Sequence, residues 1–314
     1  MTISDHPTIG WIGTGRMGAA LVARLLKAGY DVSVYNRTRT KAEALETKGA
    51  RVVERPLDLA DRDIVFTMVS APKDLEAVTI GEGGVLTSPD SHPGVLIDSS
   101  TVSTAASALI RAAANDRGTQ FLASPVSGNP SVISAGKLTV ATSGPRSTFD
   151  QVEPVLATLG RGVTYVGEGE VARLVKICHN VLLGVVTQSL AEIVVLAEKG
   201  GVSREAFLSF LNDSVMGSTF TKYKTPAFVN LDFTPTFTMP LLRKDFDLGL
   251  SAAKEYGVAV PVTALTAEIV SAAIGAGHLT DDFAALLLEQ ARNSGLDLVA
   301  EDVEIDDGLS ADAA

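Results

Sequence analysis

The chain has 314 residues, a formal net charge of -11, 46% apolar residues and 20% charged residues. This composition is that of a compact globular protein, and the length predicts two domains of ~150 residues each. The acidic balance excludes a nucleic-acid surface, because binding phosphates requires clusters of lysine and arginine and the sequence has no such cluster.

The first half of the chain alternates strand-like runs with helical runs. Strands are predicted over residues 8–12, 32–35, 64–69 and 95–97, and helices over residues 17–28 and 41–47. Gly29 is expected to end the first of these helices. The near-continuous apolar runs are typical of parallel strands that are buried on both faces of a sheet. The pattern predicts an α/β fold with a Rossmann-type doubly wound sheet.

The second half is predicted to be all helical. Residues 171–199 contain no proline and one interior glycine, Gly184, and would form a single helix of about 43 Å. Further helices are predicted over residues 204–212, 241–256, 262–275 and 282–293, with loops at Thr234-Pro235 and Met239-Pro240. We therefore expect a Rossmann-type domain over 1–168 and an all-helical substrate and dimerisation domain over 169–300. The acidic tail, 301–314, is expected to be disordered.

A glycine motif lies where the first strand meets the first helix. The segment Gly13-Thr14-Gly15-Arg16-Met17-Gly18 has the form G-x-G-x-x-G. In this context the glycines allow a tight turn, a close approach of the backbone to a pyrophosphate, and close packing of helix on strand. The N–H groups at the start of the helix would then bind the phosphates. The predicted cofactor-binding residues here are Gly13, Gly15, Arg16, Met17 and Gly18.

The end of the second strand distinguishes between the two nicotinamide cofactors. An acidic residue at this point binds the ribose 2′-hydroxyl of NAD. This chain has Asn36-Arg37-Thr38 instead, and Arg37 can pair with a 2′-phosphate while Thr38 adds a hydroxyl. NADP is therefore favoured. If Arg37 only stacks on the adenine ring, either cofactor would serve.

Four segments, residues 9–18, 98–101 with 124–128, 167–180 and 244–261, occur in the order and spacing of one enzyme family. Together they resemble the β-hydroxyacid dehydrogenase family, which includes 3-hydroxyisobutyrate dehydrogenase and the semialdehyde reductases. The resemblance covers residues 8–295. It implies hydride transfer between NADP(H) and a small β-hydroxy acid or semialdehyde, a carboxylate substrate.

Lys176 and Asn180 are the predicted catalytic residues. They lie four residues apart in the long predicted helix, so both side chains project from one face. Oxidising an alcohol requires removal of the hydroxyl proton as hydride leaves, and a lysine in a partly apolar cleft can carry that proton. The resemblance implies that Lys176 is the general acid/base and that Asn180 orients it and the substrate.

The resemblance also implies the substrate-binding residues Ser127, Gly128, Thr101 and Lys244. Ser127 and Gly128 match the family's S-G-G anchoring loop, but Asn129 and Pro130 follow where a glycine is usual. Thr101 matches a position at the nicotinamide end of the cofactor, and Lys244 either binds the substrate carboxylate or pairs with a helix neighbour. Val69 and Ser70, at another strand end, are expected under the cofactor. In addition to the residues of the glycine motif, the predicted cofactor-binding residues are therefore Asn36, Arg37, Thr38, Val69, Ser70, Thr101 and Lys244.

Two other functions share this architecture. An NADPH-dependent imine reductase is the main alternative, although such enzymes generally lack the lysine. A non-catalytic NADP-binding regulatory protein is the second, and it would need neither Lys176 nor Asn180. A decarboxylating 6-phosphogluconate dehydrogenase is disfavoured because its long C-terminal extension is missing. His179 is expected to pack, and Cys178, the single cysteine, is expected in the core.

The remaining expectations concern partners and location. The four histidines are scattered and no metal-ligand cluster is evident, so no metal is expected. Neither a signal peptide nor an unbroken apolar run of ~20 residues is found, which favours a cytoplasmic protein without membrane contact. The resemblance implies a homodimer or homotetramer, because the family's helical domain usually packs against a partner, and the long apolar helix over 171–199 fits that.

Overall fold

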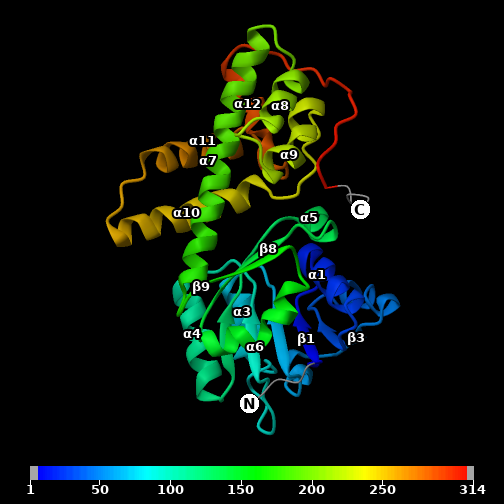
Figure 1. The fold of residues 1–314 in the computed structure, drawn as a ribbon. Coiled ribbons are helices and arrows are strands. Elements are labelled where there is room, and N and C mark those ends of the chain that lie inside the picture. Colours follow the sequence, from blue (N-terminus) through cyan, green and yellow to red (C-terminus); the bar gives the residue numbers. More distant parts are fainter. Residues whose placement is uncertain (1–5, 310–314) are drawn as a thin grey trace. The chain divides into compact units, whose positions relative to one another are not determined.

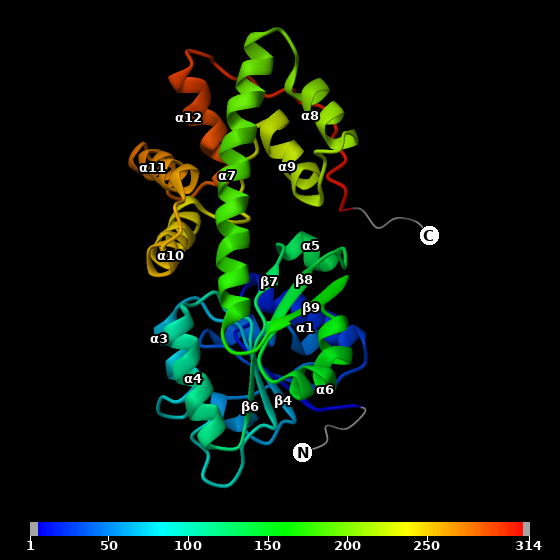
Figure 2. The same ribbon diagram turned by 60° about the vertical axis from the view of Figure 1, so that its left-hand side comes forward.

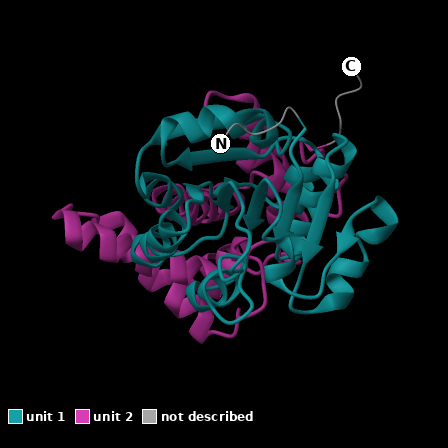
Figure 3. Cartoon of the chain, turned by 90° about the horizontal axis from the view of Figure 1, so that it is seen from below, with its two compact units in different colours: residues 1–176 teal, residues 177–314 magenta. Residues whose placement is uncertain are grey.

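The computed structural model describes residues 6–309, and the chain divides into two compact units, residues 1–176 (unit 1) and 177–314 (unit 2), which are coloured separately in Figure 3. The predicted domain boundary after residue 168 falls in the turn before the long helix, whereas the two units divide within that helix.

Unit 1 is an α/β unit built on one sheet (Figure 1). Its described strands are β1 (Ile9–Ile12), β2 (Val32–Tyr35), β3 (Arg51–Val52), β4 (Ile64–Thr67), β5 (Val95–Asp98), β6 (Gln120–Ala123), β7 (Val126–Ser127), β8 (Thr139–Ser143) and β9 (Gly162–Gly167). Its helices are α1 (Arg16–Lys27), α2 (Arg39–Glu43), α3 (Pro72–Thr79), α4 (Thr104–Asp116), α5 (Pro130–Ser134) and α6 (Arg146–Ala157), with short 3-10 turns η1 (Glu46–Lys48) and η2 (Pro56–Leu59). The predicted α/β class is confirmed.

The strand order places a ligand-binding position at the centre of the sheet. The order is β3-β2-β1-β4-β5-β6-β8-β7, with β9 beside β8. The pairs among β1 to β6 are all parallel, whereas β8 runs antiparallel to β6 and β7. From β1 the chain first moves to one side, through β2 and β3, and then returns to place β4 on the other side of β1. Ligands of open α/β sheets bind outside the carboxyl ends of the strands at such a reversal. The register aligns Ile12 with both Tyr35 and Thr67, so these three strand ends lie level.

Alternate residues of the strands fill two cores, one on each face of the sheet. Trp11, Phe66 and Ile97 pack with α1 and α6 on one face, and Trp11 stacks on Phe66 with ring centroids 4.9 Å apart. Val65 and Leu96 pack with α3 and α4 on the other. Figure 2 shows these two helix pairs on opposite sides of the strands. Burial on both faces explains why the strand segments are almost entirely apolar.

The regular secondary structure among the described residues of unit 2 is helical, apart from one isolated bridge between Thr238 and Asp282. Its close packing depends on small residues. A Cβ at Gly184 would lie 2.6 Å from the Phe246 ring, and one at Gly249 would lie 2.5 Å from Val181. The helices are α7 (Val171–Lys199), α8 (Arg204–Asp213), α9 (Thr219–Asn230), α10 (Met239–Tyr256), α11 (Pro261–Gly275) and α12 (Leu286–Asn293), with the 3-10 turn η3 (Phe283–Ala285).

Helix α7 has the predicted bounds and runs unbroken for 29 residues from unit 1 into unit 2. Among the described residues it is the one helix whose length and apolar composition would also suffice to cross a membrane, and 39% of its most apolar window is buried. The core helices of soluble proteins meet the same two criteria, so this finding is weak evidence for a membrane.

Two expectations about the second half were wrong. Met239 and Pro240 do not form a loop but the first turn of α10, where proline is favoured because the N–H it lacks would have no helical partner. Cys178 is exposed rather than in the core. At the start of the acidic tail, the Glu301 carboxylate accepts hydrogen bonds from the backbone N–H groups of Arg204 (2.7 Å) and Glu205 (3.0 Å). Residues 310–314 lie outside the described residues.

Candidate active site

The loop between β1 and α1 carries the three glycines of the motif, and their steric roles differ. Gly13 has a φ of +101°, and a Cβ there would lie 2.2 Å from the carbonyl oxygen of Met68. A Cβ at Gly18 would lie 2.0 Å from the carbonyl oxygen of Gly13. A Cβ at Gly15 would meet nothing within 4 Å. The fold itself therefore requires Gly13 and Gly18, whereas Gly15 borders open space of the kind that a pyrophosphate occupies.

The start of α1 suits an anion. Gly15 is the N-cap residue, no side chain caps the helix, and the first turn, which begins with the predicted residues Arg16 and Met17, contains no acidic residue. Thr14 Oγ1 is buried without a hydrogen-bond partner among the described residues. A buried hydroxyl without a partner is costly unless a ligand or water supplies one. Together with the helix dipole, these features fit the phosphates of a dinucleotide.

Asn36 supports the glycine loop from the end of β2. Its side-chain Oδ1 accepts a hydrogen bond from Thr14 N at 2.9 Å, and its Nδ2 donates to Thr38 O at 2.9 Å. The predicted cofactor-binding residue Asn36 thus holds together the two segments that carry the other predicted contacts. An aspartate at this position would lack the donor that fixes Thr38.

The basic residues after β2 have carboxylate partners, of which Glu43 is near Arg39 in the sequence whereas Asp74 and Glu54 are not. The Arg37 guanidinium donates to Asp74 Oδ1 at 2.9 Å, yet its side chain stays 84% exposed. Arg39 donates to Glu43 at 2.8 Å and to Glu54 at 2.5 Å, and the hydrogen bond to Glu43 is the main reason that the Arg39 pKa is raised. Arg37, whose side chain is 84% exposed and pairs with one carboxylate among the described residues, is therefore more available to a phosphate than Arg39, which is 45% exposed and pairs with two.

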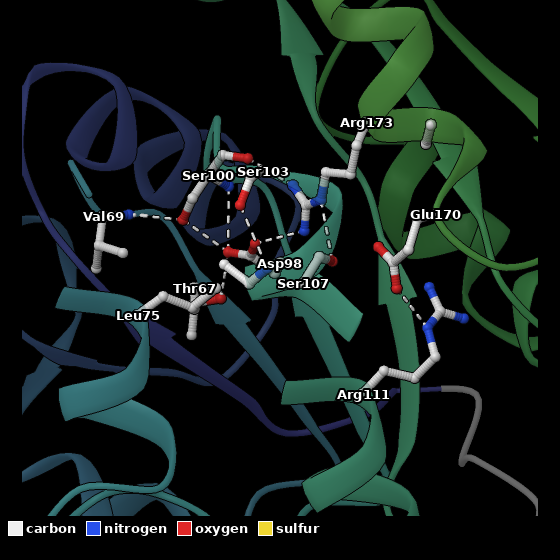
Figure 4. Close-up of polar contacts among 12 residues, drawn as sticks. Thr67, Val69, Leu75, Asp98, Ser100, Ser103, Ser107, Arg111, Glu170 and Arg173 are labelled. Carbon is white, nitrogen blue, oxygen red and sulfur yellow. Dashed lines mark hydrogen bonds and ion pairs between the residues drawn. The ribbon is translucent and has the colours of Figure 1, made fainter. Parts of the chain in front are cut away.

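A buried polar cluster joins the ends of β4 and β5 (Figure 4). Asp98 Oδ1 accepts hydrogen bonds from Thr67 Oγ1 at 2.7 Å, from Ser100 Oγ at 2.6 Å and from Ser100 N at 3.1 Å. Ser100 Oγ in turn accepts from Val69 N at 2.9 Å. The predicted cofactor residue Val69 is therefore fixed through Ser100, the residue before Thr101, while the neighbouring Ser70 is exposed.

The other oxygen of Asp98 binds an arginine of α7. The Arg173 guanidinium donates to Asp98 Oδ2 at 2.5 Å, to Ser100 O at 2.5 Å and to Ser107 Oγ at 3.1 Å. Arg173 is 1% exposed and Asp98 0% exposed, so this is a fully buried ion pair. Lys176 lies three residues further along α7 and is half-buried. Sequence reasoning missed Arg173 and the role of Asp98, although Asp98 is the first residue of the segment 98–101 that carries the family resemblance.

The loop that was expected to anchor the substrate contains a helix N-cap at the point where its sequence differs from the family pattern. Asn129 Oδ1 accepts a hydrogen bond from Val132 N at 2.9 Å, and Pro130 begins the short helix α5. Gly128, with a φ of +144°, precedes this cap, and a Cβ there would lie 2.8 Å from Val132. Ser127 ends β7. Asn129 and Pro130 therefore stiffen the backbone after Ser127-Gly128.

In unit 2, one buried aspartate joins Asn180 and Lys244. Asn180 Nδ2 donates to Asp245 Oδ2 at 2.5 Å, and Lys244 Nζ lies 3.3 Å from Asp245 Oδ1. Asp245 is 1% exposed and Asn180 4% exposed. His179, expected only to pack, instead has its Nδ1 3.0 Å from Asn180 Oδ1. Asp245 is a further functional candidate, which its place beside Lys244 in the sequence could have indicated. Among the described residues, no group of three or more metal-binding side chains is present.

The cofactor loop, the strand ends and the long helix define a class of protein, an NAD(P)-binding oxidoreductase with a helical second unit. A family model described as the NAD binding domain of 6-phosphogluconate dehydrogenase matches residues 8–167. A second, described as NAD-binding of NADP-dependent 3-hydroxyisobutyrate dehydrogenase, matches residues 167–289.

Individual proteins are similar over almost the whole chain. The chain is 32% identical to the 2-(hydroxymethyl)glutarate dehydrogenase of Eubacterium barkeri, over 89% of this chain and 93% of that protein. It is also 32% identical to the glyoxylate/succinic semialdehyde reductase 1 of Arabidopsis thaliana, over 89% of this chain and 96% of that protein. A solved structure of Mycobacterium tuberculosis 3-hydroxyisobutyrate dehydrogenase with L-serine is 28% identical, with a TM-score of 0.78 over 90% of this chain and 99% of that one.

The chain belongs to the β-hydroxyacid dehydrogenase family. The predicted family, enzyme class and NAD(P) cofactor are thereby confirmed.

Proposed function

We propose that this enzyme transfers hydride between NADP(H) and a small β-hydroxy acid or its semialdehyde, with Lys176 as the general acid/base. One observation carries the proposal. Lys176 lies one helical turn beyond Arg173, which binds the ends of the strands where an open α/β sheet holds its ligand. The bound nicotinamide would supply or accept the hydride.

The proposed roles of the protein's own residues follow from the chemistry. Lys176 removes the hydroxyl proton during oxidation and returns a proton to the carbonyl oxygen during reduction. Asn180, whose amide is oriented by Asp245, helps to orient the substrate. Ser127, Gly128, Thr101 and Lys244 bind the substrate carboxylate and the carbon chain. The Ser127 hydroxyl and backbone N–H donors can hold a carboxylate, and Lys244 can add a positive charge to that site.

The acid/base role is tested with Lys176→Ala and Lys176→Arg. Both variants should lower kcat by ~10²–10⁴-fold, because general acid–base catalysis contributes about that much and arginine stays protonated. Cofactor affinity, measured by quenching of protein fluorescence, should hardly change, and a small primary amine should restore part of the activity of Lys176→Ala. Turnover by Lys176→Ala within about threefold of the wild type would overturn the role.

The substrate class is tested by a screen of small semialdehydes, 2-oxoacids, 3-hydroxyacids and cyclic imines with both cofactors, followed at the absorbance of the reduced nicotinamide. We expect semialdehydes or 3-hydroxyacids to give the highest kcat/KM. Turnover of cyclic imines without turnover of semialdehydes would instead assign an imine reductase. An absence of any turnover with intact cofactor binding would favour a non-catalytic role.

We propose NADP(H) as the preferred cofactor, on the support of the exposed Arg37 guanidinium and of Thr38. Arg37→Ala should lower kcat/KM for NADPH by about tenfold, or ~1.4 kcal/mol, and leave NADH nearly unaffected. Arg39→Ala is the matched control, because Arg39 is already held by Glu43 and Glu54 and should matter less. A higher kcat/KM with NADH than with NADPH in the wild type would reverse the assignment.

We also propose that the enzyme is a homodimer or homotetramer. Several large apolar side chains of unit 2 are exposed in the single chain, and exposed apolar patches mark interfaces. These include Leu182 (61%), Leu196 (67%), Val262 (60%) and Leu265 (65%). Light scattering that gives the mass of a single chain would contradict this.

A further inference from the structure

The buried pair Arg173–Asp98 fixes the first turn of α7 in three directions. The guanidinium binds a carboxylate at the end of β5, a carbonyl oxygen of the loop that follows β5, and a hydroxyl of α4. In Figure 4 the guanidinium points into the cluster around Asp98. Because arginine presents its donors in a rigid planar fork, three such contacts hold both the height of the turn and its rotation about the helix axis.

The turn before α7 is held separately. Arg111 donates to Glu170 Oε1 at 2.7 Å and to Gly169 O at 2.5 Å, and Ser143 Oγ accepts from Ala172 N at 3.1 Å. These bonds anchor the place where the helix begins, and they involve the chain before Arg173. A helix held only at its first residues can still rotate, so Arg173 adds a constraint that these contacts do not supply.

Stability alone does not account for a pair of this kind. Burying both charges has a desolvation cost of several kcal/mol per ion, and well-packed apolar residues of similar volume often stabilise a protein as well or better. Buried ion pairs are instead able to specify one arrangement among several. Here the specified arrangement includes Lys176, which is a neighbour of Arg173 on the helix surface because the two are three residues apart.

We propose that Arg173, paired with Asp98, is a positioning residue that sets Lys176 against the strand ends where the hydride is transferred. The proposal rests on the proposed function of Lys176. The lysine amino group lies at the end of a long side chain, so a small rotation of the helix displaces it. A displacement of about 1 Å from the reactive arrangement can lower a rate by about 10²-fold.

The test is Arg173→Lys, which keeps a positive charge beside Asp98 but cannot reach all three acceptors with one nitrogen. We expect kcat to fall by about tenfold or more, with KM and cofactor affinity changed by less than about threefold. The primary deuterium isotope effect on kcat, measured with deuterated NADPH, should be as large as in the wild type or larger, because the hydride step becomes slower. Ser107→Ala removes one contact, leaves the ion pair intact, and should cause a smaller loss in the same direction.

The matched control is Arg204→Lys in unit 2. Arg204 is also 0% exposed, and its guanidinium donates to the Glu198 carboxylate and to the carbonyl oxygens of Val229 and Val299, while its Nε lies 3.8 Å from the Glu301 carboxylate. It should lower Tm as much as Arg173→Lys does while leaving kcat of the folded enzyme unchanged. If Arg173→Lys and Ser107→Ala lower Tm but retain wild-type kcat and isotope effect, Arg173 is merely structural and the proposal is wrong. Loss of activity in Lys176→Ala together with normal kcat in Arg173→Lys would overturn the positioning role and leave the acid/base role intact.

Discussion

The two units bury charged side chains in different places. The difference distinguishes charges that support the proposed site from charges that only hold the fold together. In unit 1 the pair Asp98–Arg173 lies at strand ends, beside the residues proposed to hold the cofactor. In unit 2 Arg204 and Lys224 bind irregular segments, namely the chain around Val299 and the chain around Thr236. A buried charge thus marks a functional position only when its partners belong to the site.

The largest expected effect is a loss of stability in unit 1, caused by a substitution in the glycine loop. Gly13→Ala should destabilise unit 1 by more than about 4 kcal/mol, because its Cβ would overlap the Met68 carbonyl oxygen and its φ is +101°. Gly15→Ala is the control, with an ordinary φ of -65° and open space around it. It should change stability by less than about 1 kcal/mol and still weaken cofactor binding. Equal loss of stability in both variants, measured by urea unfolding, would contradict this division of roles.

Removing a buried carboxylate of unit 2 should come next in size. Asp282 accepts from Lys224 Nζ at 2.5 Å and from the backbone N–H groups of Thr236, Phe237 and Ala284. Asp282→Ala leaves the Lys224 ammonium buried without its carboxylate, and should cost about 3–5 kcal/mol. The double variant Lys224→Met/Asp282→Asn removes both charges and should be more stable than Asp282→Ala. A loss below about 1 kcal/mol in urea unfolding would mean that the pair contributes little.

These buried pairs also show where prediction from the sequence ends. The bounds of α7 and β2 were predicted to the residue, because periodicity and glycine positions are local signals. Helix α9 was missed, since Pro226 lies inside it and its apolar spacing is weak. Strands β3 and β6 to β9 were missed because they are short or lack a continuous apolar run.

The site was also predictable only where its residues lie close together in the sequence. The residues of G-x-G-x-x-G and of the segment around Lys176 are contiguous, so their spacing alone singled them out. The Asp98–Arg173 pair joins residues 75 apart, and the Asn180–Asp245 bond joins residues 65 apart. No local pattern connects such partners, and only the folded chain identifies them. Asp74, which is 37 residues from Arg37, and Glu54, which is 15 residues from Arg39, were missed for the same reason.

The smallest expected effect is a pH dependence confined to unit 2. Burial raises the pKa of the Tyr223 hydroxyl, and the negative charge of Asp282 raises it further. In the unfolded chain a tyrosine loses its proton near pH 10. The folded state therefore retains a proton above about pH 10 that the unfolded state loses, so the contribution of Tyr223 to stability is fully present below that pH and declines above it.

This contribution is measured by comparing the wild type with Tyr223→Phe. At about pH 11 the folded wild type and the folded variant should show the same tyrosinate absorbance, because Tyr223 stays protonated in the folded wild type. After unfolding in urea the wild type should ionise all five of its tyrosines and the variant one fewer. The unfolding free energy of the wild type should also fall faster above pH 10 than that of the variant. If the folded wild type shows the additional tyrosinate absorbance, then water reaches Tyr223. The pair Lys224–Asp282 beside it would then not be enclosed as the pair Asp98–Arg173 of unit 1 is.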